Sequence, residues 1–191
     1  MIRLAEPKDA SEAIDLVMIV LKDMELEVFN KLPEEKITEL LITAFKEKPT
    51  YRYGFKNALI KEVDNKIAGV VFGYPDHFEE TIDNDFIDLL LENNLSEDYQ
   101  FFNKEEVETF KNEWYLDTLV TSPQFRGKGI ARELLDALPT IAKEKNCPTI
   151  GLNVDKVNSN ARRIYLNNGF EKTGELDISN HRYDHLQKSV G

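Results

Sequence analysis

The chain has few of the features that would place it in an oxidising compartment or a membrane. Cys147 is its one cysteine among 191 residues, so no intramolecular disulfide can form and a reduced, cytoplasmic setting is expected. The first residues lack the apolar core of a signal peptide. The longest apolar run, residues 16–21, is far too short to span a bilayer. We therefore expect a soluble protein without a membrane partner.

Positive charge is also scarce, and the deficit is concentrated in one segment. The formal net charge of −11 argues against a nucleic-acid partner, whose binding needs clustered Lys and Arg. Residues 75–112 carry twelve acidic side chains against Lys104 and Lys111, which is −10 of that total. Length and an otherwise ordinary composition predict a single domain over residues 1–191, with an acidic insertion at about 75–112.

Hydrophobic periodicity predicts a mixed α/β chain. The expected strands cover residues 2–5, 53–62, 67–74, 115–121, 149–154, 169–176 and 182–186, and the expected helices cover residues 10–28, 33–46, 127–145 and 159–167. Pro139 predicts a kink or a restart of the third helix near Leu138. In the acidic segment, apolar residues four apart predict a helix with these side chains inside: Phe78, Ile82, Phe86 and Leu90.

The segment Arg126-Gly127-Lys128-Gly129-Ile130-Ala131 lies between an expected strand and an expected helix. Two glycines there let backbone N–H groups approach a ligand, and the positive end of a helix favours an anion. The spacing does not match a Walker A loop, and Arg132 stands where a dinucleotide fingerprint has its third glycine. The segment predicts a phosphate or pyrophosphate site, with an ordinary glycine-rich helix start as the alternative.

A second motif follows about thirty residues later and consists of Asn158, Ala161, Tyr165, Gly169 and Phe170. With both motifs the chain resembles the GNAT superfamily of acetyl-CoA-dependent N-acetyltransferases, whose Arg/Gln-x-x-Gly-x-Gly/Ala motif matches Arg126, Gly129 and Ala131. The resemblance is good over residues 114–176, rests only on the order of elements over 1–74, and has no counterpart for 75–112. It implies a central, mostly antiparallel sheet of about seven strands flanked by helices, with the fourth and fifth strands splayed.

The resemblance implies acetyl-CoA as the donor. The residues expected to bind it are Leu119, Val120, Thr121, Arg126, Gly127, Lys128, Gly129, Ile130, Ala131, Asn158 and Tyr165. Loop amides would bind the pyrophosphate with Lys128 or Arg132 adding charge, and the strand would pair with the pantetheine arm. A backbone N–H, preferably that of Val120, would polarise the acetyl carbonyl. Asn158 would either contact CoA or cap the helix.

Tyr165 and Asp117 are the expected catalytic residues. Tyr165 matches the family's general acid, which protonates the departing thiolate, and a core aromatic is the alternative. Asp117 is the candidate base; strand alternation would place it on the face of Tyr115 and Leu119, and a structural hydrogen bond is an equal alternative. Glu113 precedes it on the same strand.

The final hairpin contains His181 and His185 without a supporting set of ligands, so no metal site is expected. Surface or packing roles are preferred for both histidines, with a substrate contact as a further option.

The leading hypothesis is an enzyme that transfers an acetyl group from acetyl-CoA to a primary amine by direct attack, without a protein nucleophile. A non-catalytic acyl-CoA-binding, regulatory or interaction domain is the alternative. The acceptor could be a small-molecule amine or an amine of a peptide or protein, and the resemblance leaves a homodimer open. The acidic segment either covers the fold or steers a cationic amine through Asp83, Asp85 and Asp88.

Overall fold

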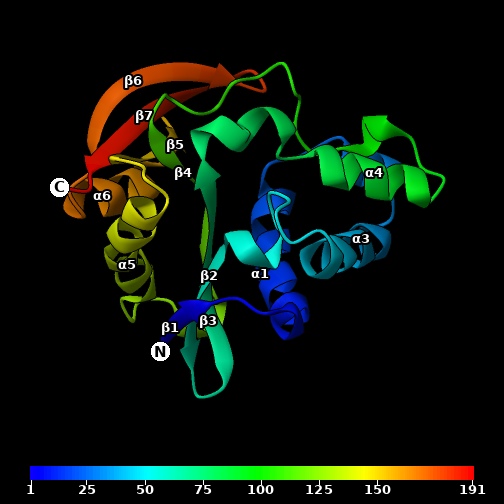
Figure 1. Cartoon of the computed structure of the whole chain (residues 1–191), viewed down its shortest axis with the longest axis horizontal. Helices are drawn as coiled ribbons and strands as arrows, with labels where there is room; N and C mark the ends of the chain where they lie inside the picture. The colour runs from blue at the N-terminus through cyan, green and yellow to red at the C-terminus, as the bar shows by residue number, and fades with distance from the viewer.

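An open sheet of seven strands organises the chain, and the computed structural model describes all residues 1–191 (Figure 1). The strands are β1 (Ile2–Leu4), β2 (Ala58–Val63), β3 (Lys66–Pro75), β4 (Glu113–Thr121), β5 (Thr149–Asp155), β6 (Glu171–Ile178) and β7 (His181–Ser189). Their order is β1-β2-β3-β4-β5-β7-β6, and every pair is antiparallel except β4–β5. The expected mostly antiparallel sheet is confirmed.

Helices cover both faces of the sheet (Figure 1). They are α1 (Ala10–Asp23), α2 (Val28–Lys31), α3 (Glu34–Glu47), α4 (Asn84–Glu92), α5 (Ile130–Glu144) and α6 (Ser159–Asn167). Short 3-10 helices are η1 (Pro7–Asp9), η2 (Phe55–Asn57), η3 (Asp76–Thr81), η4 (Glu97–Tyr99) and η5 (Pro123–Phe125). One apolar core joins α1, α3 and α4 to Val70 and Phe72, and a second joins α5 to Val71 and Leu116. We call them the α1-side core and the α5-side core. No helix is both long and apolar enough to cross a membrane.

Some elements differ from the expectation. The first helix ends at Asp23 because Glu25 adopts a positive φ of 54°. The second strand begins at Ala58, since the residues before it form η2. Helix α5 continues through Pro139 without a restart, held by the buried side chains on its inner face, Leu134, Leu135, Leu138 and Ala142.

Strands β4 and β5 pair over only three residues each, 113–115 with 149–151. Beyond Tyr115 and Gly151 the two strands separate, while each keeps its other neighbour, β3 or β7. Residues 116–121 and 152–155 therefore present edges that no strand occupies. We call this region the splay and the point where pairing ends its apex. The expected splaying of the fourth and fifth strands is confirmed.

A β-bulge lies at Asp117, just beyond the apex. Thr118 is opposite Phe72 and Leu116 is opposite Gly73, so Asp117 is the extra residue. The bulge shifts the alternation of side chains, and Leu119 packs on the α5-side core while Val120 belongs to the α1-side core. The expectation that Asp117 and Leu119 share a face is wrong for this reason.

The acidic segment, residues 75–112, folds back on itself between β3 and β4. The Glu79 carboxylate accepts the backbone N–H groups of Glu108 (2.6 Å) and Thr109 (3.2 Å), and the segment contains η3, α4 and η4. Ile82 and two α4 residues, Phe86 and Leu90, are buried as expected. Phe78 is 48% exposed, because η3 and α4 are separate and the spacing of four is interrupted.

Candidate active site

The loop after β4 exposes its backbone. Gly127 and Gly129 have φ values of 76° and 78°, a left-handed conformation that favours glycine. A Cβ on either glycine would meet nothing within 4 Å, so the space above the loop is open. Phe125 anchors the loop in the α5-side core, and the Lys128 ammonium lies 5.2 Å from its ring centre. The sequence thus builds an open concave backbone rather than a packed turn.

The N-terminus of α5 supplies a row of unused donors. The first backbone bond of the helix runs from Glu133 N–H to the Gly129 carbonyl (3.0 Å), and no amide of residues 127–132 donates within the protein. Such N–H groups and the positive helix end together favour an anion. Arg126 and Lys128 are exposed beside them and add positive charge.

The free edge of β4 continues from this loop. Ser122 N–H donates to the Ala68 carbonyl (2.8 Å), so Ser122 and Ala68 form a hydrogen-bonded pair of the antiparallel ladder. Hydrogen-bonded pairs alternate with non-hydrogen-bonded pairs along such a ladder. Val120, opposite Val70, is therefore also in a hydrogen-bonded pair and directs its amide towards β3. Leu119 and Thr121 then direct their N–H and C=O groups into the splay. The alternation therefore favours Leu119 and Thr121 over Val120 as partners for a ligand.

A helix stop fixes the position of Tyr165. Gly169, with a φ of 86°, donates to Leu166 O, and Phe170 N–H donates to Tyr165 O, both at 3.2 Å. This is a Schellman motif, and the Phe170 ring lies 5.9 Å from the Tyr165 ring as its hydrophobic contact. The Tyr-to-Gly-Phe spacing in the sequence is thus a physical requirement for ending α6 at this point.

The Tyr165 hydroxyl is suited to donate a proton. It makes no hydrogen bond within the protein, and its oxygen atom is not fully buried. Burial of the ring raises its pKa to about 12, so the hydroxyl stays protonated at neutral pH. Asn158 Oδ1 accepts from Ala161 N–H (3.1 Å), so Asn158 is the N-cap of α6, one of its two expected roles.

On the α1 side of β4, Arg52 gathers three carboxylates. Its Nε and Nη2 donate to the two oxygens of Asp83, both at 2.9 Å. Its Nη1 donates to Asp117 (2.5 Å) and to Glu108 (3.2 Å), and the guanidinium lies 4.2 Å from the Phe102 ring centre. We call Arg52, Asp83, Glu108 and Asp117 the Arg52 cluster. Sequence reasoning missed it because the partners lie 31, 56 and 65 residues from Arg52.

The Arg52 cluster fixes the positions of Asp117 and Asp83. Both Asp117 oxygens are occupied, one by Arg52 and one by the Thr118 hydroxyl (2.8 Å), and its catalytic role stays a prediction. Asp83 is bound and cannot act as a free steering charge, whereas Asp88 is exposed. Burial of Glu108, reinforced by Asp117 and opposed by Arg52, raises its pKa to about 7.

A second buried network ties the acidic segment to β7. The Glu113 carboxylate bonds to Phe110 N–H (2.8 Å), His185 Nε2 (2.9 Å) and Gln187 Nε2 (2.8 Å). The Phe110 ring stacks on His185 at 3.7 Å, and Asn153 Oδ1 contacts His185 Nδ1 at 2.6 Å. These contacts give Glu113 and His185 a structural role.

The remaining singled-out residues lie elsewhere. His181 is exposed, and its Nδ1 lies 3.3 Å from Asp155. Cys147 is buried just beyond the C-terminal end of α5, at the opposite end of the helix from the loop. No group of three or more His, Cys, Asp or Glu side chains is arranged to hold a metal ion.

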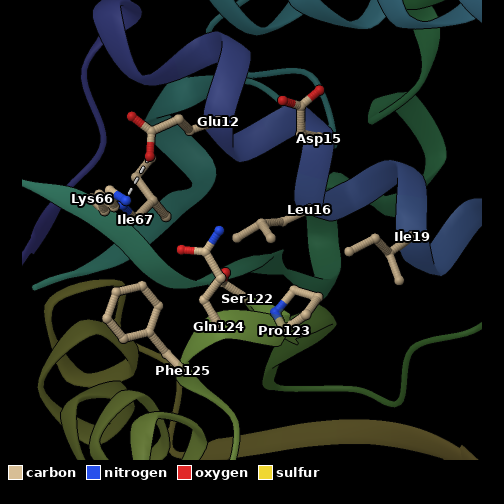
Figure 2. Close-up of a pocket in the computed structure, with 10 residues that line it drawn as sticks. All are labelled: Glu12, Asp15, Leu16, Ile19, Lys66, Ile67, Ser122, Pro123, Gln124 and Phe125. Carbon is tan, nitrogen blue, oxygen red and sulfur yellow. Dashed lines mark hydrogen bonds between the residues drawn. The ribbon is translucent and has the colours of Figure 1, made fainter.

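A cavity of about 420 Å³ adjoins the loop on the α1 side (Figure 2). Leu16 and Ile19 of α1 form one wall, and Gln124 and Phe125 enter from η5. Glu12 reaches across to accept Ile67 N–H (3.0 Å), so one of its carboxylate oxygens is already occupied. The lining is mixed, because Asp15, Lys66, Ser122 and Gln124 add polar groups to the apolar ones, and the cavity lies next to the start of the loop at Gly127 and Gly129.

Comparison with known proteins identifies the class. The acetyltransferase (GNAT) family model matches residues 21–170, and the chain belongs to this family. No curated protein matches the chain. A crystal structure of an acetyltransferase is 41% identical with a TM-score of 0.90, and each chain is covered completely.

Two further solved structures extend this likeness. An N-acetyltransferase from Staphylococcus aureus Mu50 is 30% identical with a TM-score of 0.84, covering 98% of this chain and 99% of that one. The PaiA N-acetyltransferase from Thermoplasma acidophilum, in complex with coenzyme A, is 16% identical with a TM-score of 0.55, covering 99% and 98%. At that identity it shows the shared fold alone.

Proposed function

We propose that this GNAT acetyltransferase transfers an acetyl group from acetyl-CoA to a primary amine. One observation carries the proposal. The unused amides of residues 127–132 form an anion site, and the free edge of β4 continues from it without interruption. A ligand with a pyrophosphate and an extended amide-containing arm matches both parts. The coenzyme A bound by the PaiA relative has this character and supports the choice of donor.

The reaction needs no covalent acyl-enzyme. The amine nitrogen attacks the acetyl carbon, and the backbone N–H of Leu119, directed into the splay, stabilises the oxyanion that forms. The C–S bond then breaks, and the Tyr165 hydroxyl donates its proton to the departing sulfur. Cys147 takes no part, because it is buried beyond the other end of α5.

A thiol-release assay with acetyl-CoA tests the proposal. The panel contains alkylamines, polyamines, amino acids, aminoglycosides and peptides, which cover small-molecule and protein amines. We expect release of CoA with at least one class, and a product whose mass has grown by one acetyl group. CoA binding without release for any amine would contradict the proposal and favour the non-catalytic acyl-CoA-binding alternative.

A further inference from the structure

The acidic segment crosses the sheet at the apex of the splay. Asn153, on β5 two residues beyond the last one paired with β4, donates its Nδ2 to the Glu108 carbonyl (2.8 Å). Asp117, two residues beyond the last paired residue of β4, shares Arg52 with the Glu108 carboxylate. Glu108 therefore bridges both strands where they separate.

A donor bound to the loop reaches the same point. Thr121 and Leu119 direct their backbone N–H and C=O groups into the splay, and the strand from Thr121 to Asp117 spans about 13 Å. An arm that follows this edge away from the anion site runs towards the apex, and Leu119, the proposed partner of the acyl oxygen, lies two residues from Asp117. The acyl end of the arm then lies beside the part of the acidic segment that contains Glu108.

Glu108 is the carboxylate of the Arg52 cluster with an oxygen to spare. Asp83 uses both oxygens on Arg52, and Asp117 uses one on Arg52 and one on Thr118. Glu108 Oε2 makes the longest contact to Arg52, at 3.2 Å, while its Oε1 accepts no hydrogen bond from the protein. Oε1 is also not a fully buried orphan, so it remains open to a proton donor.

The surroundings of Glu108 disfavour the ionised form of its carboxyl group but still allow it to ionise. The titratable groups that face it are Arg52, Asp117, Glu79, Tyr53, Tyr74, Tyr115 and Tyr183. Of these, Arg52 favours ionisation, and burial and the two carboxylates oppose it. The result is a carboxyl group that binds and releases a proton near neutral pH, as a general base requires. The Tyr74 hydroxyl is buried there without a partner and lies near the same cluster.

A small cavity leads from this carboxyl group towards the outside of the acidic segment. Its volume is about 70 Å³, enough for one or two water molecules. Arg52, Asp83 and Glu108 line it together with Glu79 and Glu106. Carboxylates along this route attract protons and provide a path to solvent.

We propose that Glu108 is the catalytic base that accepts the proton of the acceptor ammonium, and this rests on the proposed N-acetyltransferase function. The ammonium proton passes to Glu108 Oε1 and leaves through the small cavity. The free amine forms the N–C bond, the C–S bond breaks, and sulfur takes the Tyr165 proton. The second nitrogen proton restores Tyr165, so one proton in total reaches solvent.

Glu108→Gln tests the role, with Glu105→Gln, an exposed neighbour, as the matched control. We expect kcat/KM for an alkylamine to fall about 100-fold and the limb of the pH profile near pH 7 to disappear. Trifluoroethylamine is largely neutral at neutral pH and needs no base before attack. The Gln variant should acetylate it at close to the wild-type rate, and Glu108→Asp should retain the pH limb at reduced kcat.

The pH dependence of folding gives a readout that is independent of activity. The pKa of Glu108, about 7 in the folded protein, lies above its ordinary value of 4.5. Between these values the folded state binds more protons, so the contribution of Glu108 to stability falls as pH rises and is constant above about pH 7. Denaturant titrations should show this slope in wild-type protein and lose it in Glu108→Gln.

The outcomes separate the two proposals. Equal losses with both amines, an unchanged pH profile, or an unchanged stability slope would overturn the role of Glu108 and leave the acetyltransferase function standing. A wild-type protein that acetylates no amine would overturn the proposed function and the base together.

Discussion

The two sides of β4 carry polar groups of different kinds, backbone amides on one side and charged side chains on the other. Towards α5, the loop at Gly127 and Gly129 presents exposed backbone amides that donate to no group within the protein. Towards α1, Arg52 is buried and holds three carboxylates from distant segments. A backbone site needs only local conformation, so a short motif specifies it. A side-chain cluster needs the whole fold, so it is visible only in the structure.

The largest effect should come from disrupting the Arg52 cluster. Arg52→Met would leave Asp83, Glu108 and Asp117 buried without a counter-charge. We expect the free energy of unfolding to fall by about 3–5 kcal/mol, measured by urea titration. The control is Arg132→Met, because Arg132 is 78% exposed and its pair with Asp136 is long, at 3.8 Å. Its loss should stay under about 0.5 kcal/mol, and equal losses would show that the cluster is not special.

Tyr165→Phe should affect chemistry and leave donor binding unchanged. It removes the hydroxyl but keeps the ring that packs on Phe170. We expect kcat to fall about 100-fold, while the Kd for CoA by calorimetry stays at the wild-type value. Tyr99→Phe, in η4, is the control and should change neither quantity. Full activity of Tyr165→Phe would leave the residue as a core aromatic only.

Gly129→Ala should have a smaller effect, on the backbone half. The added Cβ meets no protein atom, so it projects into the space where an anion would approach the amides. We expect CoA to bind about tenfold more weakly, with about 1 kcal/mol of folding stability lost to the left-handed φ.

The control for this change is Gly169→Ala, which has a similar φ of 86° outside the loop. It should lose similar stability and retain CoA affinity. Weakened CoA binding in both variants would assign the effect to backbone strain and not to the loop.

The smallest effect should separate the two roles of Asn158. Asn158→Ala removes the cap of α6, and we expect about 1 kcal/mol of stability to be lost, with Asn158→Ser restoring most of it. Calorimetry with CoA then decides the second role. Unchanged affinity means that Asn158 only caps, and weaker binding in both variants means that its side chain also contacts the donor.

Local sequence signals predicted the parts of the fold that depend on local physics. The expected strands at 53–62 and 67–74 correspond to the β2–β3 hairpin, in which Asp64 and Asn65 adopt the positive φ angles of a two-residue turn. The open loop at Gly129 follows from its two glycines, whereas the mostly antiparallel sheet and its splay were implied by the family resemblance that the two short motifs carry.

Long-range packing determined the rest. The bulge at Asp117 has no signal in the alternation of β4, and it reversed the expected facing of Leu119. Pro139 should have interrupted α5, but apolar burial on the inner face of the helix keeps it continuous. Arg52 carried no motif at all, because its role depends on the acidic segment folding back over β4.

The splay has a consequence for the sheet as a whole. Only three residue pairs join the half-sheet β1–β4 to the half-sheet β5–β7–β6, so two strand edges lie unpaired in its interior. Unpaired edges invite other strands and are normally covered. The Leu119 and Thr121 amides, although central in sequence and space, should therefore exchange their hydrogens with solvent as rapidly as those of an outer strand. A bound donor would act as the missing strand and complete the sheet.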